Sequence, residues 1–147
     1  MEEQQIYYVR EMLYVLMRRL GLLQKERMIC CGPTLVQSHI IYEISKKQGI
    51  SLNDLANILG LDKSTMSRHV QSLVKEGYVK STPGEEDRRF TSLSLTTQGE
   101  AVQQRLAAQM TGYVLDIFKR IPDHKKAQVT ESIELLLKAM YEVTSCC

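Results

Sequence analysis

Apolar residues near the N-terminus recur at helical spacing, with polar positions between them. They are Ile6, Val9, Leu13, Leu16, Met17 and Leu20. This spacing predicts one amphipathic helix of about four turns. The stretch Cys30-Cys31-Gly32-Pro33 interrupts the pattern. A second helix is expected after it, because Thr34 and Gln37 fit a capping box, and Gly49 is expected to end that helix.

Two compact helices follow, and only a few residues separate them. Ser51 is expected to cap the first helix, which Gly60 ends. Asp62 is expected to cap the second, which covers residues 63–76 and is ended by Gly77. Two short helices joined by so tight a turn have the layout of a helix-turn-helix.

A β-hairpin is predicted next. Residues 78–81 and 90–95 suit two short strands, and Pro83-Gly84 is a strong turn signal between them. The tip of this hairpin would carry the charged residues Glu85 to Arg89. A helix-turn-helix followed by an arginine-tipped hairpin is typical of a winged helix-turn-helix.

Two long amphipathic helices are predicted at the C-terminal end. Thr97 and Glu100 fit a second capping box, and Pro122 suits the first turn of the last helix. The apolar stripes of these helices are Leu106, Met110, Tyr113, Val114 and Ile117, and then Val129, Ile133, Leu136, Leu137, Met140 and Tyr141. Packing against a second copy of the chain explains these long stripes better than a monomer does.

Together these elements predict a mainly α fold with a small β-hairpin wing, in which a winged helix-turn-helix is joined to N- and C-terminal dimerisation helices. The length of 147 residues suits a single domain. Residues of about 34–96 are expected to form its DNA-binding part. Residues of about 1–29 and 97–147 are expected to form the dimerisation helices.

Composition narrows the class of protein only a little. The net charge of +2 is mildly basic, so a nucleic-acid function has to rest on where the charges lie. Neither a secretory signal nor an apolar run long enough to cross a bilayer is seen, which predicts a cytoplasmic protein without a membrane partner. Motifs for phosphate loops, serine hydrolases and zinc proteases are missing, and Cys31 with His39 lacks a third orienting group. We therefore expect no enzyme.

The helix over residues 63–76 has an apolar and a polar face. Core positions are expected at Met66, Val70, Leu73 and Val74, and the opposite face carries Ser64, Thr65, Arg68, Gln71, Ser72 and Lys75. Such hydroxyls, amides and cations can hydrogen-bond base edges and phosphates in a major groove. Arg68 could fork onto a guanine, and Ser64 with Thr65 could hold a phosphate. A polar outer face is also the rule for surface helices in general.

The hairpin tip shifts the balance toward nucleic acid. Arg88 or Arg89 could enter a minor groove or lie along phosphates beside the helix. Asp87 is expected to orient one of these arginines through a charge-assisted hydrogen bond. Glu85 and Glu86 are unfavourable near phosphates, so they would face away or set a modest affinity.

The runs LDKSTMSRHVQSLVKEGYV and DRRFTSLSLTTQG, in this order of elements, closely resemble the MarR family of bacterial regulators. The resemblance extends from about residue 6 to 141 and includes a D-x-R-x-x-x-L-x-L-T pattern, met by Asp87, Arg89, Leu93, Leu95 and Thr96. The chain has Gly84-Glu85 where many members have Asp-Pro.

This resemblance implies a homodimer on double-stranded DNA, at a near-palindromic operator with half-sites roughly 34 Å apart. It implies DNA contacts from Ser64, Thr65, Ser67 and Arg68, and from Arg88 and Arg89 in the wing; Gln71 joins them from the polar helix face. Repression is the favoured mode, because a bound dimer blocks a promoter sterically. A winged helix that binds only protein partners remains an alternative.

Family members usually respond to a small molecule or to cysteine chemistry. Vicinal Cys30 and Cys31, with His39 nearby, suit a soft metal, an arsenical or an electrophile, although free cysteines are often only small buried apolar residues. No cofactor is required. A full zinc site is disfavoured because His39, His69 and His124 are far apart in the sequence. The sequence also allows a phenolic or acidic ligand near Tyr14, Tyr42 and Tyr113, and a role for the terminal Cys146-Cys147 pair.

Overall fold

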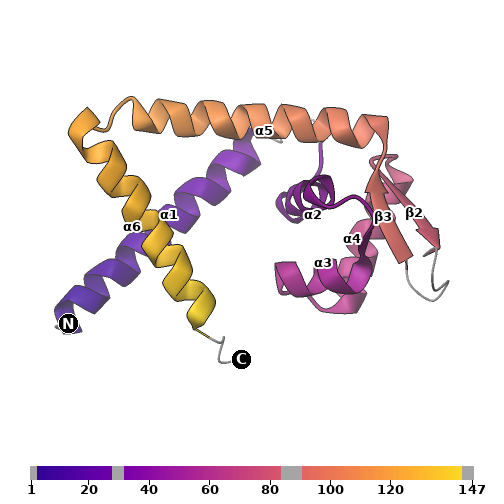
Figure 1. The fold of residues 1–147 in the computed structure, drawn as a ribbon, viewed down its shortest axis with the longest axis horizontal. Coiled ribbons are helices and arrows are strands. Elements are labelled where there is room, and N and C mark those ends of the chain that lie inside the picture. Colours follow the sequence, from indigo (N-terminus) through magenta and orange to yellow (C-terminus); the bar gives the residue numbers. More distant parts are fainter. Residues whose placement is uncertain (1–2, 28–31, 84–90, 144–147) are drawn as a thin grey trace. The chain divides into compact units, whose positions relative to one another are not determined.

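The computed structural model describes residues 3–27, 32–83 and 91–143, and the side chains of these residues except 3 and 21–27. The elements are α1 (Glu3–Arg27), α2 (Leu35–Lys46), β1 (Ile50–Ser51), α3 (Leu52–Leu59), α4 (Lys63–Lys75), β2 (Val79–Pro83), β3 (Thr91–Leu95), α5 (Thr97–Phe118) and α6 (Asp123–Glu142) (Figure 1). The predicted fold class, mainly α with a small β wing, is confirmed. The chain divides into two compact units, Met1–Arg105 and Leu106–Cys147.

The core of the first unit joins α2, α3, α4, the strands and the start of α5. Its buried apolar residues are Ile40, Ile41, Ile44, Ile50, Leu55, Ala56, Met66, Val70, Leu73, Val79, Leu93, Leu95 and Val102. The expectation that Val74 belongs to this core was wrong, since its side chain is 39% exposed. Met66, Val70 and Leu73 follow one helical stripe, and Val74 is turned by about 100° from Leu73.

Helix α2 starts as predicted and ends earlier than predicted. The Gln37 backbone N–H donates to Thr34 Oγ1 over 3.3 Å, and the Thr34 N–H donates to Gln37 Oε1 over 2.7 Å. The helix ends at Lys46, before Gly49, so the expected glycine stop was wrong. Gly49 instead turns the chain into β1 with φ +84°, and its N–H donates to the Leu93 carbonyl.

The sheet has three antiparallel strands in the order β1-β3-β2. Strand β1 was not predicted; it pairs Ile50 with Leu93. Pro83, expected in the turn, lies in β2 opposite Thr91. An edge strand tolerates proline because one side of its backbone needs no partner in the sheet.

The start of α5 is tied to the end of α4 by Thr96. Thr96 Oγ1 accepts the Gly99 N–H over 3.0 Å and donates to the Gly77 carbonyl over 2.6 Å. Thr96 therefore caps α5, and the expected cap at Thr97 was wrong by one residue. Gly99 lies directly against the backbone of Tyr78, where a Cβ atom would stand 2.0 Å from the carbonyl oxygen.

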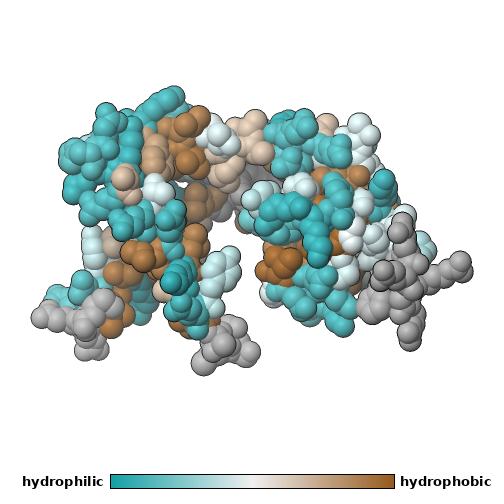
Figure 2. All heavy atoms as spheres, viewed as in Figure 1, coloured by the Kyte–Doolittle hydropathy of each residue, from teal (hydrophilic) through white to brown (hydrophobic). Residues whose placement is uncertain are grey.

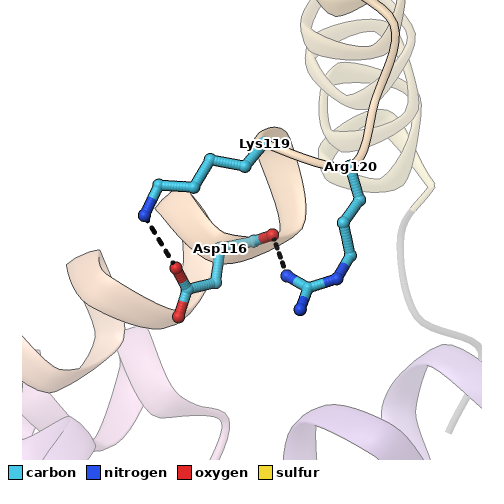
Figure 3. Close-up of polar contacts among 3 residues, drawn as sticks. All are labelled: Asp116, Lys119 and Arg120. Carbon is cyan, nitrogen blue, oxygen red and sulfur yellow. Dashed lines mark hydrogen bonds and ion pairs between the residues drawn. The ribbon is translucent and has the colours of Figure 1, made fainter.

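In the second unit, two cationic side chains that directly follow α5 bind Asp116 in its last turn (Figure 3). Lys119 pairs with the Asp116 carboxylate at 3.0 Å, and Arg120 Nη1 donates to the Asp116 carbonyl over 2.6 Å. Cations at a helix C-terminus bind carbonyls that lack partners within the helix. Pro122, expected in the first turn of α6, stands at the N-cap position instead, and the helix begins at Asp123.

The long helices expose much of their apolar surface in the single chain. Exposed members of their stripes are Ile6, Val9, Leu16, Met17 and Leu20 on α1, Met110, Val114 and Ile117 on α5, and Ile133, Leu136, Leu137, Met140 and Tyr141 on α6. Helix α6 has no buried residue, and hydrophobic atoms reach the surface of the second unit in Figure 2. Within the described residues, no helix has the length and apolarity needed to cross a membrane.

Candidate nucleic-acid interface

Helix α4 is fixed in the winged unit by the turn before it and by its buried face. Gly60 adopts the left-handed conformation with φ +62° and ends α3, and the Leu61 N–H then donates to the Ala56 carbonyl over 3.0 Å. Met66 is fully buried and Val70 is nearly so. Because this apolar face is buried in the core, the opposite face of α4 must point outward.

That outward face carries the sequence-predicted contact residues. Ser64, Arg68 and Gln71 are exposed, and Thr65 and Ser67 beside them are half-buried. The exposed three are spaced by four and three residues, which places them on one stripe of the helix. The stripe is polar and includes one guanidinium group, which suits both phosphates and base edges.

Most of these side chains are held by neighbours on α4 itself. Arg68 Nη2 donates to Thr65 Oγ1 over 3.3 Å, and Gln71 Nε2 donates to Ser67 Oγ over 3.4 Å. A guanidinium has five N–H donors, so this long bond leaves most of the capacity of Arg68 for a ligand. The contacts orient both long side chains along the stripe.

The first turn of α4 contains a carboxylate bound to the helix. Asp62 Oδ1 accepts the Ser64 hydroxyl at 2.5 Å and the Thr65 N–H at 2.9 Å. The Ser64 hydroxyl and then Thr65 hold the pKa of Asp62 well below its ordinary value. The sequence indicated Asp62 as a cap but missed its bond to Ser64; the short D-x-S spacing is the signal that could have shown it.

The wing is described only up to the ends of its strands. Pro83 of β2 pairs with Thr91 of β3, and the residues between them lie outside the described part of the chain. Asp87, Arg88 and Arg89 lie outside the described residues, and their predicted DNA contacts stay predictions.

Candidate effector residues are placed only in part. Cys30, Cys31, Cys146 and Cys147 lie outside the described residues, so both thiol hypotheses stay predictions. His39 is exposed on α2. Among the described residues, no three His, Cys, Asp or Glu side chains gather as a metal site. Of the tyrosines proposed for an organic ligand, Tyr14 and Tyr42 are exposed and Tyr113 is half-buried.

Comparison with known proteins relates part of the chain to a family. Residues 32–89, which include α2, α3 and α4, match the model of the MarR family. Over this winged part the chain is similar to MarR-family proteins.

Curated proteins that are similar to this chain are transcriptional regulators. The regulator PetP of Rhodobacter capsulatus is 30% identical over 67 residues, which cover 46% of this chain and only 40% of PetP. The regulator BilQ of Clostridium symbiosum is 26% identical over 116 residues, which cover 79% of this chain and 77% of BilQ. These relatives are transcriptional regulators and not enzymes, in line with the expectation for this chain.

Solved structures support the same fold over nearly the whole chain. FabT of Streptococcus pneumoniae, solved in complex with DNA, has a TM-score of 0.87 at 16% identity and covers 95% of this chain and 99% of its own. A MarR regulator of Methanosarcina mazei has a TM-score of 0.83 at 22% identity, and the match covers 94% of this chain and 99% of the regulator. Likeness at these identities establishes the winged fold, while DNA contacts have to be argued from the residues of this chain.

Proposed function

We propose that this protein is a DNA-binding transcriptional regulator of the MarR family that docks α4 in the major groove. The observation that carries the proposal is the exposed polar stripe of Ser64, Arg68 and Gln71 on a helix whose other face is buried. Seven residues of helix rise about 10 Å, so the stripe extends over about three base pairs. It therefore has the size and chemistry of a sequence-reading surface.

The protein acts as a homodimer on a near-palindromic operator. Support comes from the exposed apolar stripes of α1, α5 and α6, since exposed apolar surface on a helix marks a protein interface. Two-fold symmetry then presents two copies of α4 to half-sites about 34 Å apart. Such a dimer would repress by covering a promoter, and an effector would release it.

Arg68→Ala tests this proposal. If Arg68 reads a base, its loss weakens operator binding about 5- to 150-fold, which corresponds to about 1–3 kcal/mol, and relaxes sequence preference at one position. Lys138→Ala on α6 is the control, because it removes one positive charge outside the winged unit. Fluorescence anisotropy would compare duplexes tiled upstream of the protein's own gene with random DNA of equal length.

Two outcomes would count against the proposal. An Arg68→Ala protein with unchanged affinity and preference would remove Arg68 from base reading. A wild-type protein that prefers no tiled duplex, and no duplex enriched by selection from a random pool, would favour a winged helix that binds protein partners.

A further inference from the structure

A carboxylate side chain of the protein itself lies at the N-terminus of α4. A helix N-terminus favours negative charge because its first N–H groups lack partners and its dipole is positive there. In this chain the Asp62 carboxylate occupies that position and accepts both the Thr65 N–H and the Ser64 hydroxyl. The exposed carboxylate is negative at neutral pH, as any aspartate is, and these hydrogen bonds lower its pKa further.

This arrangement has two consequences for a DNA phosphate at the same place. A serine hydroxyl has one proton, and Ser64 uses it to donate a hydrogen bond to Asp62. Phosphate oxygens at neutral pH only accept, so Ser64 has no donor left for them. The carboxylate also repels the phosphate directly, and water screens charges on an exposed helix end only in part.

We propose that Asp62 is a specificity-determining residue, whose carboxylate keeps the first turn of α4 from binding the DNA backbone. This inference rests on the proposed function, since it assumes that α4 meets DNA. It assigns Ser64 to a contact within the protein, in place of the phosphate contact that the sequence suggests. Sequence-independent affinity is lowered as a result, and recognition depends more on Arg68 and Gln71.

Two variants separate the effect of the Asp62 charge on DNA binding from the effect of the Ser64 hydroxyl. Asp62→Asn removes the charge and keeps a good N-cap, because asparagine caps helices as well as aspartate does. Ser64→Ala removes the hydroxyl and is compatible with a helix. Asp123→Asn is the matched control, since it makes the same chemical change at the start of α6, where Asp123 pairs with Lys126.

The assay is fluorescence anisotropy with a random-sequence duplex of about 30 base pairs, enough for two half-sites one helical turn apart. A selected operator duplex is measured in parallel, both across a salt series. Asp62→Asn is expected to bind random DNA at least about threefold more tightly, which is the effect that Coulomb's law gives for a unit charge roughly 7 Å from a phosphate in bulk water. The slope of log K against log salt should steepen by up to about one.

Ser64→Ala should leave both affinities within about twofold, the scatter normal for surface substitutions, and Asp123→Asn should change neither affinity nor salt slope. The inference is overturned if Asp62→Asn binds random DNA no better than wild type, or if Ser64→Ala loses tenfold or more. The salt slope distinguishes these effects from a change in folding, which would not add a phosphate contact. Wild-type protein without operator preference would overturn the proposed function itself, which is a different result.

Discussion

Gly99→Ala tests the closest backbone approach in the winged unit. A Cβ atom on Gly99 would lie 2.0 Å from the carbonyl oxygen of Tyr78 and 3.0 Å from its carbonyl carbon. Real Cβ atoms do not approach so closely, and backbone atoms cannot rotate away as a side chain can. The first turn of α5 must therefore move away from Tyr78, and Thr96 then loses its hold on the Gly99 N–H.

The expected cost follows from these contacts. Overpacking costs up to about 3 kcal/mol when nothing nearby can yield. Loss of the Thr96 cap destabilises the protein by about 1 kcal/mol more. The better helix propensity of alanine offsets about 1 kcal/mol of this loss. We therefore expect Gly99→Ala to lower the free energy of unfolding by about 3 kcal/mol.

Urea unfolding followed by circular dichroism measures this value, at one fixed protein concentration because a dimer is stabilised by mass action. Gly112→Ala is the control within the same helix: no atom lies within 4 Å of its added Cβ, so it should be neutral or stabilising by up to about 1 kcal/mol. Equal stabilities of the two variants would refute the argument from backbone contact.

Two further predictions concern the dimer and the start of α4. Leu136→Glu on the exposed stripe of α6 should shift the protein toward monomer in sedimentation velocity, because it places a charge in an apolar interface, whereas Glu134→Gln should not; an unshifted Leu136→Glu would exclude this stripe from the interface. The pKa of Asp62 is lowered from its ordinary value of 3.8, so its stabilisation is complete above about pH 4 and is lost as pH falls toward the lowered pKa. The difference in urea midpoint between wild type and Asp62→Asn should therefore shrink from about pH 5 to pH 3, and a constant difference would contradict it.

Sequence patterns predicted most of the helices and the features that start them. Thr34, Ser51 and Asp62 cap their helices through bonds to a backbone N–H three residues ahead. Such bonds join neighbours in the chain, so residue type and spacing are enough to reveal them. The polar stripe with Arg68 and Gln71 was predicted for the same reason, because helical periodicity orders side chains around α4 before any packing is known.

Other features depend on parts of the chain that are distant in sequence. Strand β1 has only two residues, and it exists because Ile50 pairs with Leu93. Thr96, and not Thr97, caps α5 because the fold brings the Gly77 carbonyl within reach of its hydroxyl. Neither pairing leaves a local signal, since each depends on loops that bring distant backbone groups together.

Sequence alone determined the order of the helices and of the hairpin, the family resemblance and the helix face that meets solvent, because each follows from short-range periodicity and motif. Tertiary structure decided which groups from distant parts of the chain meet. Thr96 Oγ1 donates to the Gly77 carbonyl, and the Gly99 backbone lies directly against Tyr78. Residue type shows that a threonine can cap a helix, whereas the acceptor of its single hydroxyl proton depends on the atoms that the fold places beside it.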